Sequence, residues 1–361
     1  MTGTTTGAAE SVTCPACHAS IAPGWQFCEA CGADLPADVA HDAGDATVEI
    51  PVAPAAALGA VPTTCSCGGK FAADGYCETC GSRAPNPRDH FTEQPAAWVA
   101  AVCDKGIRHA RNEDAMALAA DDQPGSRAVL VVCDGVTTAT DSDIASLAAA
   151  RAARDVLDTS HAQGLGTPSS RVSAVVARLN AATDAANDAV IASSRDDAAA
   201  NPPSCTFVAA VVENGLVVAG NVGDSRAYWV PDTGEAVMLT RDDSFAAEQI
   251  AAGVPREQAE HGPQAHAITR WLGSDAPPHA PRTTSFEPGG PGWLLLCSDG
   301  LWNYSSEPAE LAALVRRTAA ENGGRPLATA EGLVAFANAA GGQDNITAAL
   351  ARIETTQEGA V

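Results

Sequence analysis

Residues 205–230 read CTFVAAVVENGLVVAGNVGDSRAYWV and hold two apolar runs that are joined by Glu213-Asn214-Gly215. An Asn-Gly pair between apolar runs is a strong signal for a β-hairpin, because both residues tolerate the backbone of a tight two-residue turn. Other short apolar runs are typical of buried strands, and they cover residues 96–106, 128–135, 292–300 and 345–354.

Ala-rich segments with apolar residues at helical spacing lie between these runs. The segment 142–160 begins with Ser and Asp, which favour a helix N-terminus, and further helices are expected at 171–194, 307–320 and 326–340. Hairpins mixed with helices indicate antiparallel sheets covered by helices, rather than an alternating parallel βαβ wind. The predicted fold class is therefore α+β.

The charge balance of the chain argues against several classes of partner. Its 361 residues include 21 Lys and Arg against 44 Asp and Glu, a formal net charge of −23. So acidic a surface repels phosphate backbones and anionic membranes, and neither nucleic acid nor membrane is expected as a partner. The first residues show no signal peptide, and no run reaches the roughly 18 apolar residues of a membrane span. We therefore expect a cytoplasmic protein.

Eight of the 12 cysteines lie before residue 81, in two similar modules. The first has the spacing Cys-x2-Cys-x10-Cys-x2-Cys and the second Cys-x-Cys-x9-Cys-x2-Cys. Four thiolates at such spacings suit one tetrahedral zinc ion, whose binding would supply the folding free energy of so small a module. Redox-active or unpaired thiols are the alternative. The candidate zinc ligands are Cys14, Cys17, Cys28 and Cys31 in the first module, and Cys65, Cys67, Cys77 and Cys80 in the second.

The two modules divide the chain into five segments. Both resemble short bacterial zinc ribbons, which implies structural zinc and a role in docking or scaffolding. The residues between them are rich in Ala, Pro and Asp with little periodicity, as in flexible linkers. The expected organisation is a zinc ribbon at 1–35, a linker at 36–62, a second ribbon at 63–83, a linker at 84–95 and the α+β domain at 96–355.

Aspartates at the ends of predicted strands are the most informative feature of the large domain. Asp134 and Asp299 end apolar runs, and Asp344 precedes the last run. Asp114 is the last residue of an Asn-Glu-Asp sequence, and Asp224 is the central residue of a Gly-Asp-Ser sequence. Each could be an ordinary turn residue. If they converge, however, their mutual repulsion requires cations. Hard oxygen ligands select Mg²⁺ or Mn²⁺, and two such ions can activate a water at neutral pH.

Eight short motifs resemble, in order and spacing, those of the PP2C-type (PPM) metal-dependent protein serine/threonine phosphatases. The motifs are GIRHARNEDA (106–115), VVCDGV (131–136), SCTFVAAV (204–211), VGDSRAYW (222–229), LTRDDS (239–244), ITRWLG (268–273), LLLCSDGLW (294–302) and GGQDNIT (341–347). The resemblance implies an α-β-β-α sandwich of two antiparallel sheets flanked by helices. It also implies hydrolysis of phosphoserine and phosphothreonine in proteins by a metal-bridged hydroxide, without a covalent phosphoenzyme.

The resemblance assigns metal ligands to named positions. Asp134 would bridge two Mg²⁺ or Mn²⁺ ions, with the carbonyl of Gly135 on one ion and Asp299 and Asp344 on the other. By the same resemblance, Glu113 and Asp114 would hold metal-bound waters, and Asp224 would belong to a third and weaker metal site. The residues that match supporting positions of the family are Thr206, Ser225, Arg226, Thr269, Arg270, Gly300 and Asn345.

Three positions depart from the family pattern. The arginine that binds substrate phosphate is replaced by His109, and either neighbour, Arg108 or Arg111, could take its place because a guanidinium fork matches phosphate. Residues 136–143 replace a Gly-rich stretch, and Asp243 stands where a histidine is common.

The intact ligand set favours an active phosphatase that acts on phosphoproteins of a serine/threonine kinase system. The first alternative is a weakly active or inactive adaptor of the same fold, in which the zinc ribbons perform the function. A transcription-linked zinc-ribbon protein is a third interpretation, which the net charge of −23 disfavours.

Overall fold

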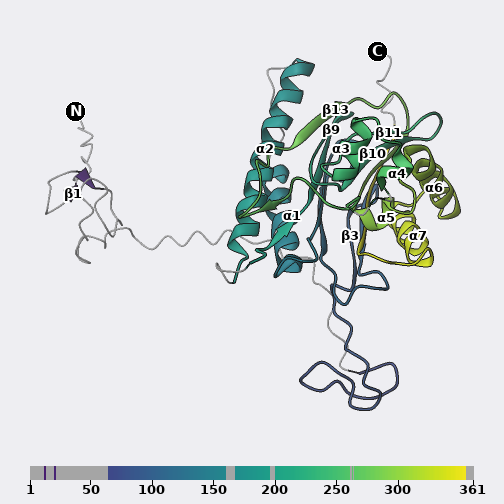
Figure 1. Ribbon diagram of the computed structural model, residues 1–361. Helices are drawn as coiled ribbons and strands as arrows, with labels where there is room; N and C mark the ends of the chain where they lie inside the picture. Colours follow the sequence, from purple (N-terminus) through teal and green to yellow (C-terminus); the bar gives the residue numbers. More distant parts are fainter. Residues whose placement is uncertain are drawn as a thin grey trace, which may run out of the picture. The chain divides into compact units, whose positions relative to one another are not determined.

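The computed structural model (Figure 1) describes residues 64–159, 167–195, 200–260, 262 and 264–354, together with the backbone of 12–13 and 20–21. The chain divides into two units, Met1–Ala55 and Ala56–Val361. In the first unit, strands β1 (Val12–Thr13) and β2 (Ser20–Ile21) form an antiparallel pair. The predicted zinc ligands of that unit lie outside the described residues; they are Cys14, Cys17, Cys28 and Cys31.

Two antiparallel sheets form the centre of the second unit. The six-stranded sheet has the order β11 (Val237–Met238), β10 (Arg226–Pro231), β14 (Gly292–Cys297), β15 (Ile346–Ile353), β4 (Val99–Asp104), β3 (His90–Ala96). The five-stranded sheet has the order β13 (Arg282–Phe286), β9 (Leu216–Val222), β8 (Phe207–Glu213), β6 (Arg127–Asp134), β5 (Asp114–Ala120). Strands β7 (Ser204–Cys205) and β12 (Leu272–Gly273) form a separate two-stranded antiparallel sheet.

Each sheet is covered by helices on its outer face, so the predicted α-β-β-α sandwich is confirmed (Figure 1). Helices α1 (Ser142–Asp158) and α2 (Pro168–Ala192) pack on the five-stranded sheet. Helices α6 (Pro308–Glu321) and α7 (Pro326–Ala339) pack on the six-stranded sheet. The shorter helices are α3 (Phe245–Ala251), α4 (Arg256–Glu260) and α5 (Asp299–Trp302). Among the described residues, no helix combines the length and the hydropathy that a bilayer crossing requires.

The central strands are apolar on both faces because both faces are buried. In β6, Leu130 and Val132 belong to the core between the two sheets, whereas Val129 and Val131 pack under α1 and α2. Successive side chains of a strand point to opposite faces. An uninterrupted apolar run is therefore what a strand inside a four-layer sandwich requires.

The predicted hairpin joins β8 to β9. Glu213 pairs with Leu216 across the turn, and Asn214 and Gly215 have φ angles of 48° and 81°. Positive φ at both central residues is the geometry of a two-residue turn that matches the twist of its strands. This hairpin supplies two neighbouring strands of the five-stranded sheet.

The six-stranded sheet begins N-terminal to the expected domain start at residue 96. Its edge strand β3 starts at His90, within the segment 84–95 whose composition resembles a linker. The register between β3 and β4 shifts between Glu93 and Ala96, on either side of Pro95. A proline cannot donate a ladder hydrogen bond, and an edge strand with such an irregularity tolerates it.

Candidate metal and active site

Strand ends from both sheets meet at one edge of the sandwich. Asp114, at the start of β5, pairs directly with Asp134, at the end of β6. Asp299 follows β14 and Asp344 precedes β15, and these two strands are neighbours in the other sheet. The hydroxyl of Ser298 donates to Asp114 Oδ2 at 2.7 Å and so links the two sheets at this edge.

The carboxylates are close enough to change one another's titration. Burial raises the pKa of Asp114 to about 7 and that of Asp299 to about 6, and the charge of Asp344 adds to both. Burial, followed by the charges of Asp114, Asp299 and Asp344, holds the pKa of Asp134 well above its usual range. The pKa of Asp224 is also raised well above its usual range, by burial and by the charge of Asp299. The structure thus brings all five predicted aspartates into one electrostatic cluster.

This cluster has the donor chemistry that divalent cations require. Among the described residues, Asp114 Oδ1 and Asp299 Oδ1 are buried and have no hydrogen-bond partner. A buried carboxylate oxygen without a donor is costly, and a cation removes both that cost and the repulsion between the carboxylates. Oxygen donors of this kind suit Mg²⁺ and Mn²⁺. The residues present therefore fit the ions that the sequence predicts.

Two glycines allow the backbone to close around the carboxylates. A Cβ at Gly135 would lie 2.7 Å from the carbonyl oxygen of Glu113. A Cβ at Gly300 would overlap the carbonyl oxygen of Asn345. Both positions are next to candidate ligands, so any side chain there would push the strand ends apart.

Glu113 is buried and held from several elements. Its side chain accepts hydrogen bonds from Arg111 Nη2 at 2.7 Å and from Ser142 Oγ at 2.5 Å, and its backbone N–H donates to Asn345 Oδ1 at 2.7 Å. Ser142 belongs to the segment 136–143, which departs from the family pattern. That segment therefore contributes a hydrogen bond to the site in place of the Gly-rich stretch.

The three residues considered for substrate phosphate lie in different surroundings. His109 contacts two carboxylates, with Nε2 3.2 Å from Asp344 Oδ1 and Nδ1 3.7 Å from Glu113 Oε2. Arg111 is paired with Glu113. Arg108 is exposed on the same loop, and its backbone N–H donates to the carbonyl of Gly342. Of the two arginines, only Arg111 has its guanidinium bound to a carboxylate of the site.

Asp243, the third departure, is bound by two arginines. Arg270 Nη1 donates to its Oδ2 at 3.1 Å, and Arg282 Nε donates to its Oδ1 at 2.8 Å. The charge of the carboxylate is thus balanced locally. Arg282 lies on the polar edge strand β13, which has no apolar signal in the sequence, and its role was not predicted.

Ser298 and Thr347, which the sequence analysis does not name, and Thr206, which it does, complete the hydrogen bonding of the cluster. Thr347 Oγ1 donates to Asp114 Oδ2 at 2.7 Å, beside the bond from Ser298. Thr206 Oγ1 accepts from the backbone N–H of Asp134 at 3.1 Å. Ser298 and Thr347 stand inside two of the quoted motifs; Ser298 directly precedes Asp299, whereas Thr347 follows Asp344 by three residues.

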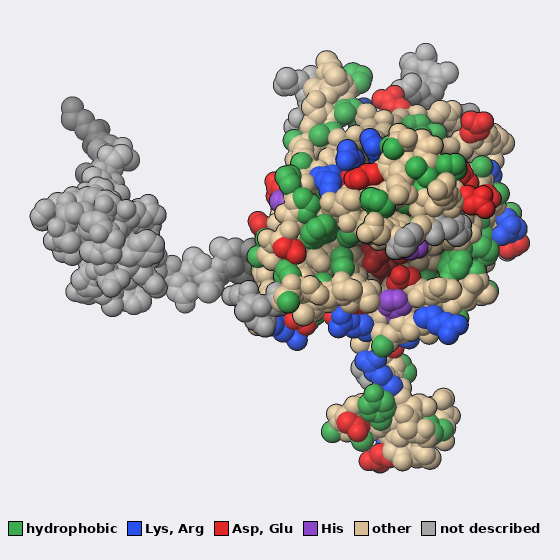
Figure 2. Space-filling view, viewed as in Figure 1, with side chains coloured by type: hydrophobic (Ala, Val, Ile, Leu, Met, Phe, Trp, Pro, Cys, Tyr) green, Lys and Arg blue, Asp and Glu red, His purple; other side chains and the backbone are tan. Residues whose placement is uncertain are grey.

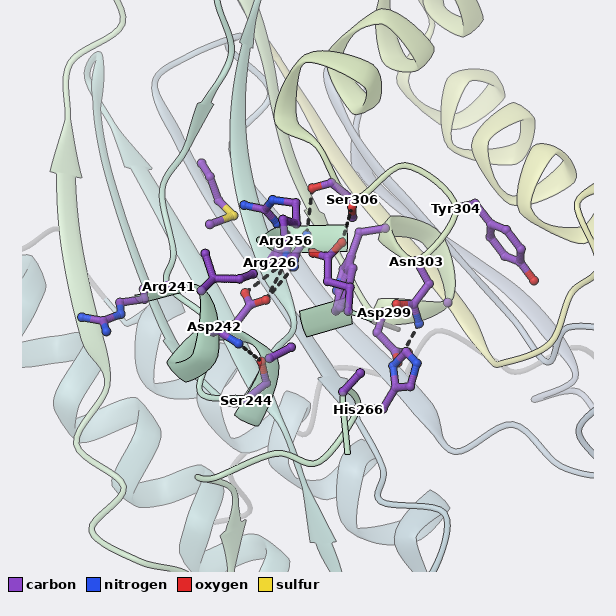
Figure 3. A pocket seen from close by; sticks show the side chains of 18 of the residues that line it. Arg226, Arg241, Asp242, Ser244, Arg256, His266, Asp299, Asn303, Tyr304 and Ser306 are labelled. Carbon is purple, nitrogen blue, oxygen red and sulfur yellow. Dashed lines mark hydrogen bonds and ion pairs between the residues drawn. The ribbon is translucent and has the colours of Figure 1, made fainter. Parts of the chain in front are cut away.

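A cavity of about 910 Å³ opens beside Asp299 and Asp344. Figure 2 shows acidic and histidine side chains meeting in a hollow on the face that is drawn. The far wall of the cavity comes from the segment that follows β11, and Figure 3 shows His266 of this segment close to Asp299 and Asn303. Apolar side chains of α3 also line it, including Ala247 and Ile250. A cavity of this size can hold a peptide segment next to the carboxylates.

The second cysteine module forms a separate cluster at residues 64–83. The four sulfur atoms all lie within 4.8 Å of one another, with 3.6 Å between Cys65 and Cys80 and 3.5 Å between Cys67 and Cys77. Ligand sulfurs around a tetrahedral zinc at about 2.3 Å lie about 3.8 Å apart. The four sulfurs therefore fit one zinc ion.

Comparisons with known proteins agree with this geometry. The family model described as protein phosphatase 2C matches residues 106–335, and the zinc-ribbon domain model matches residues 13–35. The serine/threonine phosphatase stp of Listeria monocytogenes serotype 4b is 30% identical over 247 residues, which are 66% of this chain and 88% of the relative. The crystal structure of Mycobacterium tuberculosis PstP/Ppp has a TM-score of 0.58 and 27% identity, covering 71% of this chain and 98% of that chain. The catalytic domain of PstP in complex with two manganese ions has a TM-score of 0.54 and 26% identity, with coverages of 71% and 98%.

Proposed function

The chain belongs to the protein phosphatase 2C family, and on this premise we propose that it hydrolyses phosphoserine and phosphothreonine in proteins at the carboxylate cluster around Asp134. The observation that carries the proposal is the convergence of strand ends from both sheets, which leaves buried oxygens of Asp114 and Asp299 without donors. In the proposed site, Asp134, the backbone carbonyl of Gly135, Asp299 and Asp344 would hold the divalent cations.

The bound ions would supply charge neutralisation at the phosphoryl group and a water that is acidic enough to act as a nucleophile. The residues of this chain prepare the site for them. Glu113 and Asp114, fixed by the hydroxyls of Ser142 and Ser298, would orient water at the cations. Asp224, which is 5% exposed, is the candidate for a third and weaker cation site.

We assign the substrate phosphate to Arg108 rather than to Arg111, because Arg111 is already paired with Glu113. His109 lies between Glu113 and Asp344, and its proposed part is to hold these two carboxylates in position. The cavity beside Asp299 would take the peptide around the phosphorylated residue. Phosphoproteins of a serine/threonine kinase system are the proposed substrates.

Release of phosphate from a phosphothreonine peptide tests this function. We expect the full chain to release phosphate in proportion to time when Mn²⁺ or Mg²⁺ is present, and to release none when neither ion is added, because the cations complete the site. The measurement is steady-state phosphate release with and without Mn²⁺. Saturable Mn²⁺ binding without any turnover would contradict the proposal and would favour the adaptor of the same fold.

We further propose that each cysteine module holds one structural zinc ion and serves to dock a partner or to regulate the phosphatase. The support is the sulfur geometry at Cys65, Cys67, Cys77 and Cys80 and the similar spacing of the first module. We expect about two zinc ions per chain, one for each set of four thiolates. Elemental analysis of protein purified without chelator measures this number, and protein that holds no zinc would refute the assignment.

A further inference from the structure

The residues between the second cysteine module and β3 are folded against the phosphatase domain. Asn86 and Asp89 close a turn, in which the backbone N–H of Asp89 donates to the carbonyl of Asn86 at 2.8 Å. The side chain of Asn86 accepts from the backbone N–H of Arg88 at 3.0 Å. Lys105 then fixes the turn to β4 through a hydrogen bond from its backbone N–H to the carbonyl of Asp89. The turn holds Arg88 in one place.

The guanidinium of Arg88 joins two backbone segments that flank the carboxylate cluster. Its Nη1 donates to the carbonyl of Asp143 at 2.7 Å, and its Nη2 donates to the carbonyl of Asp114 at 2.5 Å. In return, Asn112 Nδ2 donates to the carbonyl of Arg88 at 2.8 Å. One of the joined segments carries Glu113 and Asp114, and the other begins α1 next to the serine that bonds Glu113.

The cysteine module itself contacts the same loop. Arg83 forms a β-bridge with Tyr76 and therefore belongs to the module, and its Nη1 donates to the carbonyl of Ala110 at 2.9 Å. Ala110 lies between His109 and Arg111. Two arginines, one in the module and one in the turn that follows it, thus hold the loop from Ala110 to Asp114.

We propose that Arg88 is a positioning residue that couples the four-cysteine module to the loop carrying Glu113 and Asp114, and so sets the affinity of the carboxylate cluster for divalent cations. This inference rests on the proposed function, because it concerns the same cluster. A planar fork can reach two carbonyls on separate segments at once, which a lysine ammonium cannot do in the same geometry. Partners that orient metal ligands typically contribute about 10- to 100-fold to metal affinity.

The first test replaces Arg88 with Met in the full chain. We expect Mn²⁺ affinity, measured by calorimetric titration, to fall by about tenfold, the lower end of the range for partners of metal ligands, because Arg88 acts through the backbone of Asp114, which orients water and is not itself an assigned ligand. Activity at saturating Mn²⁺ should fall less than activity at limiting Mn²⁺. Arg88→Lys keeps the charge and most of the volume, and we expect it to lose an intermediate amount of affinity.

Arg127→Met is the matched control. Arg127 is buried and, like Arg88, binds the carbonyl of a residue near a helix end, Leu157 at 2.7 Å, but it lies at the end of β6 opposite to Asp134. We expect this variant to lose thermal stability and to keep its Mn²⁺ affinity within about twofold. Equal losses of affinity in the Arg88 and Arg127 variants, or an unchanged affinity in both Arg88 variants, would overturn the inference. A wild-type chain that neither binds Mn²⁺ nor releases phosphate would instead refute the proposed function.

A second experiment tests the coupling to the module. Cys80→Ser removes one exposed thiolate of the cluster. We expect it to lower Mn²⁺ affinity in the wild-type chain, but to have less than about a twofold effect in a chain that already carries Arg83→Met and Arg88→Met, since contacting residues give non-additive effects. The same loss in both backgrounds, or no loss in either, would overturn the coupling.

Discussion

Replacing Asp134 with Asn should lower the Mn²⁺-dependent release of phosphate from a phosphothreonine peptide by more than about a hundredfold. Even a residue that only orients a metal ligand can change metal affinity by about that factor. Asp134 lies at the centre of the carboxylate cluster, because the charges of Asp114, Asp299 and Asp344 all raise its pKa. Asparagine keeps the shape of the side chain and removes its charge. Asp299→Asn and Asp344→Asn should change turnover in the same direction.

The metal-free Asp134→Asn variant should unfold at the same temperature as the metal-free wild type or at a higher one. The raised pKa of Asp134 shows that its charged form is unfavourable in the folded protein without cations, and the substitution removes that charge. The loss of activity would then not result from unfolding. Asp122→Asn is a suitable control, because Asp122 is exposed just beyond the end of β5 that lies away from the cluster. Undiminished turnover in all three cluster variants would contradict the ligand assignment.

Replacing Arg226 with Met should lower the free energy of unfolding by about 3–5 kcal/mol, the usual cost of leaving one partner of a buried ion pair without the other. Arg226 is 3% exposed and binds Asp242 through Nη2 at 2.6 Å and through Nε at 3.0 Å. Its guanidinium also lies 3.5 Å from the centre of the Trp302 ring. Methionine fills part of the space, but it leaves the carboxylate of Asp242 buried and unpaired. Urea denaturation measures the change.

The effect of pH distinguishes this cause from a simple loss of packing. Burial already raises the pKa of Asp242 while Arg226 is present, and removal of the arginine raises it further. The stability deficit of the variant should therefore shrink as the pH falls and Asp242 becomes protonated. Arg226→Met combined with Asp242→Asn should recover part of the loss at neutral pH.

Arg352→Met is the matched control for the Arg226 variant. Arg352 also pairs with a carboxylate, Asp232, and also stacks on a tryptophan, Trp293, with 5.3 Å to the ring centre. The side chains of this pair are 20% and 40% exposed, so its loss should cost no more than about 1 kcal/mol. A similar small loss in the Arg226 variant would contradict the account of the buried pair.

Elements with strong local signals were predictable from the sequence. The runs at 128–135 and 292–300 are buried on both faces and therefore apolar throughout, and they became β6 and β14. The expected helix 142–160 became α1, Ser142–Asp158. Strand β13, Arg282–Phe286, is polar and largely exposed at a sheet edge, so no hydrophobic pattern marked it. The order of strands within the sheets depends on contacts between distant segments, which local periodicity does not contain.

The site was predictable to a similar extent. The aspartates stand beside strand ends in motifs of recognisable spacing, and the structure brings them together. The residues that hold them act from remote positions through single hydrogen bonds. Ser142 lies in a segment without a family motif, and Arg88 lies in a Pro-containing stretch whose composition resembles a linker. Neither position has a local signal that would distinguish it from an ordinary surface residue.

An anomalous difference map from crystals of the full chain grown with Mn²⁺ tests the central claim most directly. We expect two peaks that share the carboxylate of Asp134, with Asp299 and Asp344 at one of them, because these strand ends bring hard oxygen donors together. The absence of any peak within coordination distance of Asp134 in protein that releases phosphate would contradict the account.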